Sequence, residues 1–311
     1  MKILIIGHKN PDTDSVVAAI SYAELKNKID PKNKYIPGVT GEINNETKFV
    51  LDYFNFSAPK FTKDLSNSKD NIIIVDYNEL SQAPEGIDKD KIVEFIDHHR
   101  LGGMETAAPV YVRIEPIGST STIIAKIFKE KGITPSKIIA SLMISGIISD
   151  TLFLHEKTTT KSDKIVLSKL NKICRIRNLE DYASQMFEAK SDITGISASE
   201  IITEDYKEFN FGQKKIGIGV WETVKPESVL QEKEQLIKAL KKLENDKKLS
   251  FIYFIVVDIL HGESEMIIIG KEEQEVAEKV FGGKTQENIL SLGKRMSRKK
   301  EIVPPLEKFL G

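Results

Sequence analysis

The opening stretch MKILIIGHKNPDTDS constrains the fold more than any other part of the sequence. Lys2 to Ile6 form a short apolar run, which is typical of a buried β-strand and too short for a helix. Pro11 lacks a backbone donor and disfavours helical geometry at Asn10, so we expect a turn there. From Ser15 onward the apolar residues recur at helical spacing. The chain therefore begins with a strand–turn–helix unit.

The turn of this unit carries one imidazole and two carboxylates, from His8, Asp12 and Asp14. Open α/β sheets bind their ligands at the carboxyl ends of strands, which is where these side chains would lie. Acceptor groups that lie so close together repel one another unless a cation sits between them. Either carboxylate alone could simply cap the following helix, but capping does not explain the triplet.

Two further apolar runs end in the same kinds of residue. They are Asn71 to Asp76 and Ile92 to Asp97, and His98 and His99 follow the second. Helical stretches between these strands favour a parallel sheet with crossovers, in which the carboxyl ends of neighbouring strands converge. We expect Pro31 to Gly41 to be a loop, because the segment is rich in turn residues.

Two helices are predicted to contribute to the same region. Residues 135–148 form an apolar stretch that would deliver Asp150 at its end. Gly118 to Thr122 would open another helix, and a helix start rich in hydroxyls and free N–H groups can bind an anion. Plain capping by Ser119 or Thr120 explains the same residues at least as well.

The second half of the chain follows a different order of elements. A length of 311 residues suits two domains better than one compact core. We expect an α/β protein in which residues 1–187 form a domain with a parallel sheet. Residues 188–195 are polar and would be a linker, and residues 196–311 would form a smaller α/β domain with a mixed sheet.

Composition excludes several classes of protein. The net charge of −1 gives no general basic field for non-specific binding of nucleic acid. One cysteine, Cys174, excludes an intrachain disulfide framework and a thiolate metal cage. The longest apolar run, Phe251 to Val257, is too short to span a bilayer, and we find no signal-peptide pattern. We therefore expect a cytoplasmic protein that binds neither nucleic acid nor membranes.

The candidate site residues are carboxylates and imidazoles, and a set without thiolates suits manganese, cobalt or magnesium better than structural zinc. The set exceeds the needs of one ion, so we expect two ions bridged by a shared carboxylate, that of Asp76. Such a pair deprotonates a water for in-line attack on phosphorus. The candidates are His8, Asp12, Asp14, Asp76, Asp97, His98, His99 and Asp150.

A basic cluster near the C-terminus supplies the opposite charge. It consists of Lys294, Arg295, Arg298, Lys299 and Lys300. Such a run is usually a solvated surface, but it also complements a polyanionic substrate, because arginine can bind two phosphate oxygens and lysine acts as a point charge. Lys207 is a further candidate of this kind.

Taken together, these motifs resemble the DHH phosphoesterase superfamily. The matching segments are His8-Lys-Asn-Pro-Asp12-Thr-Asp14, Asp76, Asp97-His98-His99 and Ser149-Asp150-Thr151. Two more segments make the sequence similar to family II, manganese-dependent inorganic pyrophosphatases, from residue 1 to about residue 304. They are Asp205-Tyr206-Lys207-Glu208-Phe209 and Ser297-Arg298-Lys299-Lys300.

The resemblance implies roles for individual residues. One metal ion would be held by His8, Asp12 and Asp76, and the other by Asp14, Asp76, His98 and Asp150. Phosphate would be bound by His99, Lys207, Arg298 and Lys299. The implied reaction is hydrolysis of pyrophosphate to two phosphates by a metal-bridged hydroxide between two domains. The implied cofactor is Mn²⁺, for which Co²⁺ or Mg²⁺ can substitute.

The resemblance also implies a homodimer formed by the N-terminal domains and a mobile C-terminal domain that closes over the substrate. Tyr77 stands where this family usually carries a histidine, which bears on the surroundings of the metals rather than on their ligands. Some relatives carry a regulatory nucleotide-binding insert between the two domains, and at this length we expect no such insert here. Alternatives are another DHH enzyme, either an exopolyphosphatase or a nucleotide phosphodiesterase, and a metal-dependent phosphate-binding protein without turnover.

Overall fold

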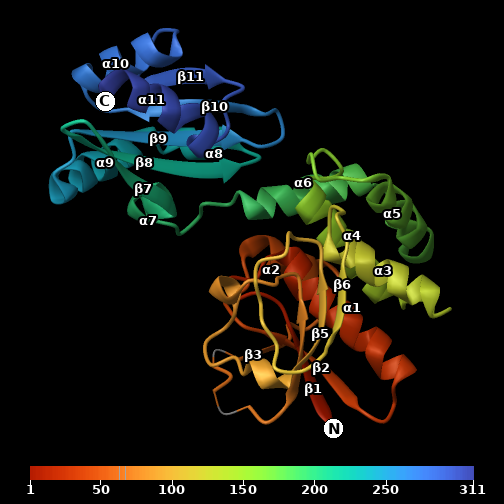
Figure 1. Ribbon diagram of the computed structural model, residues 1–311. Helices are drawn as coiled ribbons and strands as arrows, with labels where there is room; N and C mark the ends of the chain where they lie inside the picture. Colours follow the sequence, from red (N-terminus) through yellow and green to blue (C-terminus); the bar gives the residue numbers. More distant parts are fainter. Residues whose placement is uncertain (63, 67) are drawn as a thin grey trace. The chain divides into compact units, whose positions relative to one another are not determined.

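The computed structural model describes residues 1–62, 64–66 and 68–311, and within this part the chain divides into two compact units (Figure 1). Unit 1 comprises Met1–Lys190 and unit 2 comprises Ser191–Gly311. Each unit has its own sheet. Helix α6 (Leu179–Lys190) closes unit 1, so residues 188–190 of the predicted linker are helical.

Unit 1 is built on a sheet of six strands, counted over the described residues, which pair in parallel in the order β3-β2-β1-β4-β5-β6. The strands are β1 (Lys2–Ile6), β2 (Lys34–Val39), β3 (Lys60–Phe61), β4 (Asn71–Val75), β5 (Ile92–Asp97) and β6 (Tyr111–Ile114). The three strands that the sequence predicts, β1, β4 and β5, are neighbours at the centre. The parallel sheet confirms the predicted fold class of this part.

The order of the strands reverses between β1 and β4. The chain adds β2 and β3 on one side of β1 and then returns to place β4 on the other side. The loops that leave β1 and β4 therefore diverge, which opens a crevice at the carboxyl ends of these two strands. His8 and Asp76 follow these strands, so the fold places the predicted site at this reversal.

Two local predictions about unit 1 are wrong. The expected loop from Pro31 to Gly41 contains β2, and among the described residues β2 pairs with β3 only at Gly38 and Val39. Pro37 is tolerated because this side of the strand is sparsely paired, and a missing donor costs little there. The connection from β4 to β5 has 3₁₀ turns, η1 (Leu80–Gln82) and η2 (Lys89–Lys91), in place of a longer helix.

The remaining helices of unit 1 support the sheet and the site. They are α1 (Thr13–Ile29), α2 (Asn45–Tyr53), α3 (Thr120–Glu130), α4 (Lys137–Thr151) and α5 (Lys161–Cys174). Helix α4 is buried along most of its length and packs against α1, α3 and α5, as expected for a helix that is apolar on all sides. Its start is capped by the Ser136 side chain, which accepts from the Ile139 N–H.

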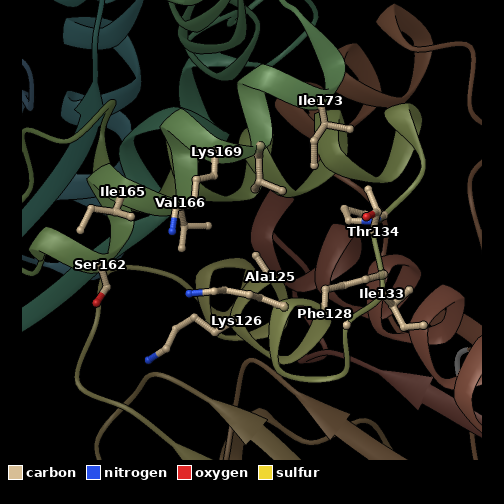
Figure 2. Close-up of a pocket in the computed structure, with 14 residues that line it drawn as sticks. Ala125, Lys126, Phe128, Ile133, Thr134, Ser162, Ile165, Val166, Lys169 and Ile173 are labelled. Atoms are coloured by element: carbon tan, nitrogen blue, oxygen red, sulfur yellow. The ribbon is translucent and has the colours of Figure 1, made fainter.

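A cavity of about 460 Å³ lies between α3 and α5 (Figure 2). Its walls are mainly apolar and include Phe128, Ile133 and Val166, and Lys126 and Lys169 also line it. None of the predicted site residues lines this cavity. The cavity is therefore distinct from the predicted metal site.

Unit 2 contains a mixed sheet of five strands, counted over the described residues, in the order β11-β10-β9-β8-β7. Strands β8 and β9 pair in parallel and the other pairs are antiparallel, which confirms the predicted mixed sheet. The strands are β7 (Asp205–Phe211), β8 (Lys214–Thr223), β9 (Phe251–Asp258), β10 (Glu263–Ile268) and β11 (Ile289–Gly293).

Helices cover this second sheet on both faces. Alternate residues of β9 belong to two separate cores, with Phe251 and Tyr253 in one and Ile252 and Phe254 in the other. The helices of unit 2 are α7 (Ala198–Thr203), α8 (Pro226–Gln231), α9 (Lys233–Lys247), α10 (Lys271–Phe281), the π-helix η3 (Arg298–Ile302) and α11 (Val303–Leu310). Among the described residues, no helix combines the length and the apolar character needed to cross a membrane.

A pair of carboxyl groups joins α9 and α10. Glu273 is 3% exposed, accepts a hydrogen bond from the Ile252 N–H at 2.8 Å and forms a hydrogen bond with Glu244. Burial, reinforced by the charge of Glu244, raises the pKa of Glu273 from 4.5 to about 7. When folding raises the pKa of an acid, the folded state has its full stability at pH values below the pKa of the unfolded chain. The folded state therefore loses stability as the pH rises from about 4.5 to about 7.

We predict that Glu244→Gln removes part of this loss, because a neutral amide relieves the repulsion and can still donate to Glu273. The variant should be more stable than the wild type by about 1 kcal/mol at pH 8 and indistinguishable from it at pH 4. Thermal unfolding at both pH values tests this. Glu275→Gln, at an exposed position of α10, is the control with the same change of charge. A stabilisation independent of pH would contradict the prediction.

Candidate metal centre

The side chains predicted to bind metal converge at the carboxyl ends of β1, β4 and β5. His8 and Asp12 lie in the turn after β1, Asp76 follows β4 directly, and His98 follows β5. The helices complete the set, with Asp14 in the first turn of α1 and Asp150 in the last turn of α4.

These side chains form overlapping groups whose candidate ligand atoms lie within 4.8 Å of one another. Asp76 belongs to every one of these groups and is fully buried, so its carboxylate is the point that they share. Two of the groups match the two predicted ligand sets. The groups are His8, Asp12 and Asp76; Asp14, Asp76, His98 and Asp150; and Asp76, His98 and His99.

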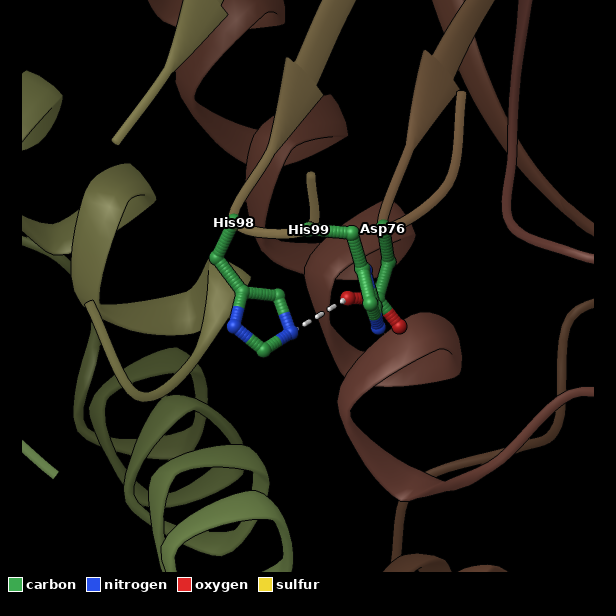
Figure 3. Close-up of side chains that lie close together, drawn as sticks. All are labelled: Asp76, His98 and His99. Carbon is green, nitrogen blue, oxygen red and sulfur yellow. Dashed lines mark ion pairs between the residues drawn. The ribbon is translucent and has the colours of Figure 1, made fainter. Parts of the chain in front are cut away.

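The two oxygens of Asp76 face different histidines. His8 Nε2 lies 3.6 Å from Asp76 Oδ2, and His98 Nε2 lies 3.5 Å from Asp76 Oδ1, the contact that is dashed in Figure 3. His8 Nε2 also lies 3.5 Å from Asp12 Oδ2, and His98 Nε2 lies 3.2 Å from Asp150 Oδ2. Each histidine thus lies near one oxygen of Asp76 and near one further carboxylate, that of Asp12 for His8 and that of Asp150 for His98. A carboxylate that bridges two metal ions requires this arrangement.

The backbone of Asp76 is held in an uncommon conformation. Its φ of +67° lies in the left-handed region, which aspartate visits more readily than bulkier residues. The Asp76 N–H donates to the Ile96 carbonyl at 2.9 Å, so the residue stays tied to β5 although β4 has ended. Such a conformation persists only where the surroundings fix it, and it is common at functional sites.

The residues fit the metal ions that the sequence predicts. Asp76 Oδ1 accepts from the Thr120 hydroxyl at 2.9 Å. Asp76 Oδ2 and His98 Nε2 are buried and make no hydrogen bond within the described part of the chain, although His8 Nε2 lies 3.6 Å from the first and Asp150 Oδ2 3.2 Å from the second. Buried polar atoms are nearly always satisfied, so these two atoms point to a missing partner. Carboxylate oxygens and imidazole nitrogens are ligands that suit a divalent ion such as manganese.

Helix α3 begins with an anion site, and the anion is the carboxylate of Asp14. Its oxygens accept from the Thr120 N–H at 2.7 Å and the Ser121 N–H at 3.1 Å, and the Ser121 hydroxyl donates as well. Ser119 also caps the helix, so both expectations for this segment hold. The N-terminal dipole of α3 therefore offsets part of the negative charge of the site.

Gly146 allows α4 to approach this cluster. A Cβ atom at Gly146 would lie 2.3 Å from Asp14 Oδ1 and 2.4 Å from Ser121 Oγ, which is closer than any real contact. Because α4 also carries Asp150, any larger residue at this position would displace a predicted ligand as well as a helix.

Hydrogen bonding fixes the tautomer of His98. Its Nδ1 lies 3.0 Å from the Ile117 carbonyl, which can only accept, so Nδ1 carries a hydrogen and Nε2 faces the carboxylates. Burial alone would lower the pKa of His98, but its contact with Asp150 and the charge of Asp14 raise it to about 9. Burial and the neighbouring carboxylates raise the pKa of Asp76 and that of Asp150. A cation that enters the site would therefore displace protons.

Asp97 supports the two histidines that follow it. Its Oδ1 accepts from His98 N at 2.7 Å, His99 N at 3.1 Å and His99 Nδ1 at 2.9 Å. Its Oδ2 accepts from the Asn78 amide. Burial would raise the pKa of Asp97, but the hydrogen bonds from His99 and Asn78 outweigh it and lower the pKa. With both oxygens occupied, Asp97 orients His99, whose side chain is 47% exposed.

Comparisons with known proteins agree with this geometry. The chain matches the DHH family, N-terminal domain, over residues 2–147 and the DHHA2 domain over residues 184–309. It is 39% identical to a manganese-dependent inorganic pyrophosphatase of Methanothrix thermoacetophila, over 98% of this chain and 97% of that protein. It is 42% identical to a Clostridium acetobutylicum protein assigned the same activity, over 98% and 96%. The chain belongs to the manganese-dependent inorganic pyrophosphatase family.

A solved structure of this family also resembles the chain. It is that of a Methanococcus jannaschii protein assigned to the family II inorganic pyrophosphatases, with a TM-score of 0.69 and 34% identity. The match covers 100% of this chain and 99% of the other. The fold of both units thus agrees with that of the pyrophosphatase family.

The predicted phosphate-binding residues other than His99 lie in unit 2. Lys207 is exposed on β7, and Lys299 is exposed in η3. Arg298 is 9% exposed, and its Nη2 donates to Asp205 Oδ1 at 2.6 Å while its Nη1 donates to the Ile218 carbonyl at 3.2 Å. The guanidinium thus joins η3 to β7 and β8, and a role in binding phosphate stays a prediction for all three residues.

Sequence reasoning missed several residues that support the site. Asn78 holds Asp97, and the Thr120 hydroxyl holds Asp76. Glu46 accepts hydrogen bonds from residues next to the predicted ligands. Asn78 follows Asp76 closely and could have been noticed, but nothing in the sequence around Glu46 signals its burial. Tyr77 is buried in an apolar cluster, and its hydroxyl has no hydrogen-bond partner within the described residues.

We predict that Asp76→Asn abolishes the stabilisation of the protein by Mn²⁺. Asparagine tolerates the left-handed backbone and can keep the hydrogen bond from Thr120, but it cannot supply two charged oxygens. At a Mn²⁺ concentration 100 times its Kd, the wild type should gain about 2.7 kcal/mol and the variant nothing. Thermal unfolding with and without Mn²⁺ measures this. Asp52→Asn, at an exposed position, is the control and should behave as the wild type. A full Mn²⁺ shift in Asp76→Asn would exclude Asp76 as a ligand.

Proposed function

We propose that this chain hydrolyses inorganic pyrophosphate to two phosphates and uses Mn²⁺ as its cofactor. The observation that carries the proposal is the position of Asp76, whose two oxygens face two separate histidine–carboxylate groups. Pyrophosphatases with this cofactor are identical to the chain at about 40% of positions over nearly its whole length.

The ligand sets follow the groups in the structure. We propose that His8, Asp12 and Asp76 hold one ion. Asp14, Asp76, His98 and Asp150 would hold the other. When bound, the two ions would supply a nucleophilic water and neutralise charge on the phosphoryl oxygens.

His99 would contact a phosphate oxygen of the substrate. Its Nδ1 is held by Asp97 at 2.9 Å, which leaves Nε2 as the nitrogen that can meet a substrate. The contact with Asp97 fixes the orientation of the ring, so Nε2 would be the atom that meets a phosphate oxygen.

The second unit would supply further positive charge. We propose that Lys207, Arg298 and Lys299 bind phosphate, with residues 1–187 as the metal-binding domain and residues 196–311 as the substrate-binding domain. Lys299 is exposed, so its ammonium group is accessible to a ligand. The proposal includes a homodimeric cytoplasmic enzyme without nucleic-acid or membrane partners.

Phosphate release from pyrophosphate tests the proposed function directly. Protein stripped of metal with a chelator should regain activity with micromolar Mn²⁺ or Co²⁺ and much less with equal Mg²⁺, because nitrogen ligands favour transition ions. The same assay is repeated with Zn²⁺ as the metal ion, and with triphosphate, ATP and a short oligonucleotide as substrates. Pyrophosphate should be preferred over ATP and the oligonucleotide by orders of magnitude. Comparable rates on the oligonucleotide would replace this proposal with a phosphodiesterase activity.

We predict that Lys299→Ala lowers kcat/KM by roughly 10- to 150-fold and leaves Mn²⁺ affinity unchanged. The loss corresponds to about 1.5–3 kcal/mol for a charge-assisted phosphate contact. Steady-state kinetics and Mn²⁺ titration measure the two effects separately. Lys308→Ala is the control with the same change of charge, since Lys308 is exposed on α11 and lies outside the basic cluster. Wild-type kinetics in Lys299→Ala would show that the basic cluster is only a solvated surface.

A further inference from the structure

We propose that Glu46 is a positioning residue that holds the turn carrying Asp12 and Asp14 against the end of α4, which carries Asp150. Glu46 lies in the first turn of α2 and is 0% exposed. Its Oε2 accepts from Thr13 Oγ1 at 2.8 Å and from Ser149 Oγ at 2.7 Å. A single carboxylate oxygen thus joins the start of α1 to the end of α4.

The two donors are direct neighbours of predicted ligands. Thr13 lies between Asp12 and Asp14, and Ser149 precedes Asp150. These ligands belong to both ion groups, so the network around Glu46 bears on the whole centre. Groups that hydrogen-bond the supports of metal ligands orient those ligands and influence metal affinity.

The Glu46 side chain is itself held in place. Thr13 Oγ1 lies 3.1 Å from Thr47 Oγ1, so the Thr13 hydroxyl can accept from Thr47 while it donates to Glu46. The N-terminal position in α2 also favours a negative side chain. These contacts join three helices, α1, α2 and α4, through one buried polar cluster.

Burial of this carboxylate is not explained by stability alone. Glu46 Oε1 is buried and has no hydrogen-bond partner within the described residues. A buried acceptor without a donor destabilises the folded state, and a polar group of this kind in a native protein calls for an explanation. The explanation we propose is that Glu46 is buried because its Oε2 holds two hydroxyls, those of Thr13 and Ser149, which are next to predicted metal ligands.

The inference rests on the metal site of the proposed function but not on the identity of the substrate. We therefore test it by the Mn²⁺ affinity of the purified full-length chain, measured calorimetrically without substrate. Glu46→Ala removes the acceptor and should weaken Mn²⁺ binding by about 10- to 100-fold. Glu46→Gln keeps an oxygen that can accept from both hydroxyls, so its loss should be under about tenfold.

Tyr182→Phe is the matched control. Tyr182 is buried and its hydroxyl lies 2.7 Å from Ser145 Oγ, one turn of α4 before Ser149. The control should lower the unfolding temperature and leave the Mn²⁺ affinity unchanged. Ser149→Ala, which removes one of the two donors, should give an intermediate loss of affinity. It keeps the proposal testable should Glu46→Ala fail to fold.

Three results would overturn the proposal. The first is wild-type Mn²⁺ affinity in Glu46→Ala or in Ser149→Ala. The second is a loss of Mn²⁺ affinity in Glu46→Gln as large as that in Glu46→Ala. The third is a loss of Mn²⁺ affinity in Tyr182→Phe as large as that in Glu46→Ala. The second would assign the effect to the charge of Glu46, and the third to general destabilisation. If the Mn²⁺ affinity depends on Glu46 as expected but the chain does not hydrolyse pyrophosphate, the proposed function is disproved and the positioning role stays intact.

Discussion

The arrangement of the candidate metal centre in unit 1 depends on the mutual repulsion of its buried carboxylates. Asp14 and Asp76 are fully buried, and Asp12 and Asp150 lie close enough to raise the pKa of Asp76. In a low-dielectric interior such a group is stable only if donors and cations surround it. The fold supplies the donors, from the start of α3 and from Thr120. Among the described residues, nothing hydrogen-bonds Asp76 Oδ2 or His98 Nε2, so both atoms can bind a cation.

The architecture of unit 1 brings these compensating groups together. The reversal of strand order between β1 and β4 opens the crevice in which His8 and Asp76 meet. Helix α3 directs its N–H groups at Asp14, and α4 can approach because position 146 is glycine. Fold and electrostatics therefore depend on each other here, since a sheet without these helices would leave the carboxylates uncompensated.

Much of this site could be predicted from the sequence because its parts are local. An apolar run followed by His8, by Asp76 or by His98 indicates a strand end with a ligand, and parallel strands bring such ends together. The prediction failed where tertiary context overrides local preference. β2 forms despite Pro37 because its neighbours tolerate a missing donor there, and no local pattern reveals which neighbours a strand will have.

The sequence by itself determined the α/β class and the candidate ligand residues, because hydrophobic periodicity and residue chemistry are properties of short segments. Only the tertiary structure decided which oxygen of Asp76 faces which histidine, that the start of α3 serves Asp14, and that Arg298 is held by Asp205. It also decided that Glu46 is buried between α1 and α4. Such contacts join residues far apart in the chain, and their geometry depends on how whole helices pack, which no local sequence pattern encodes.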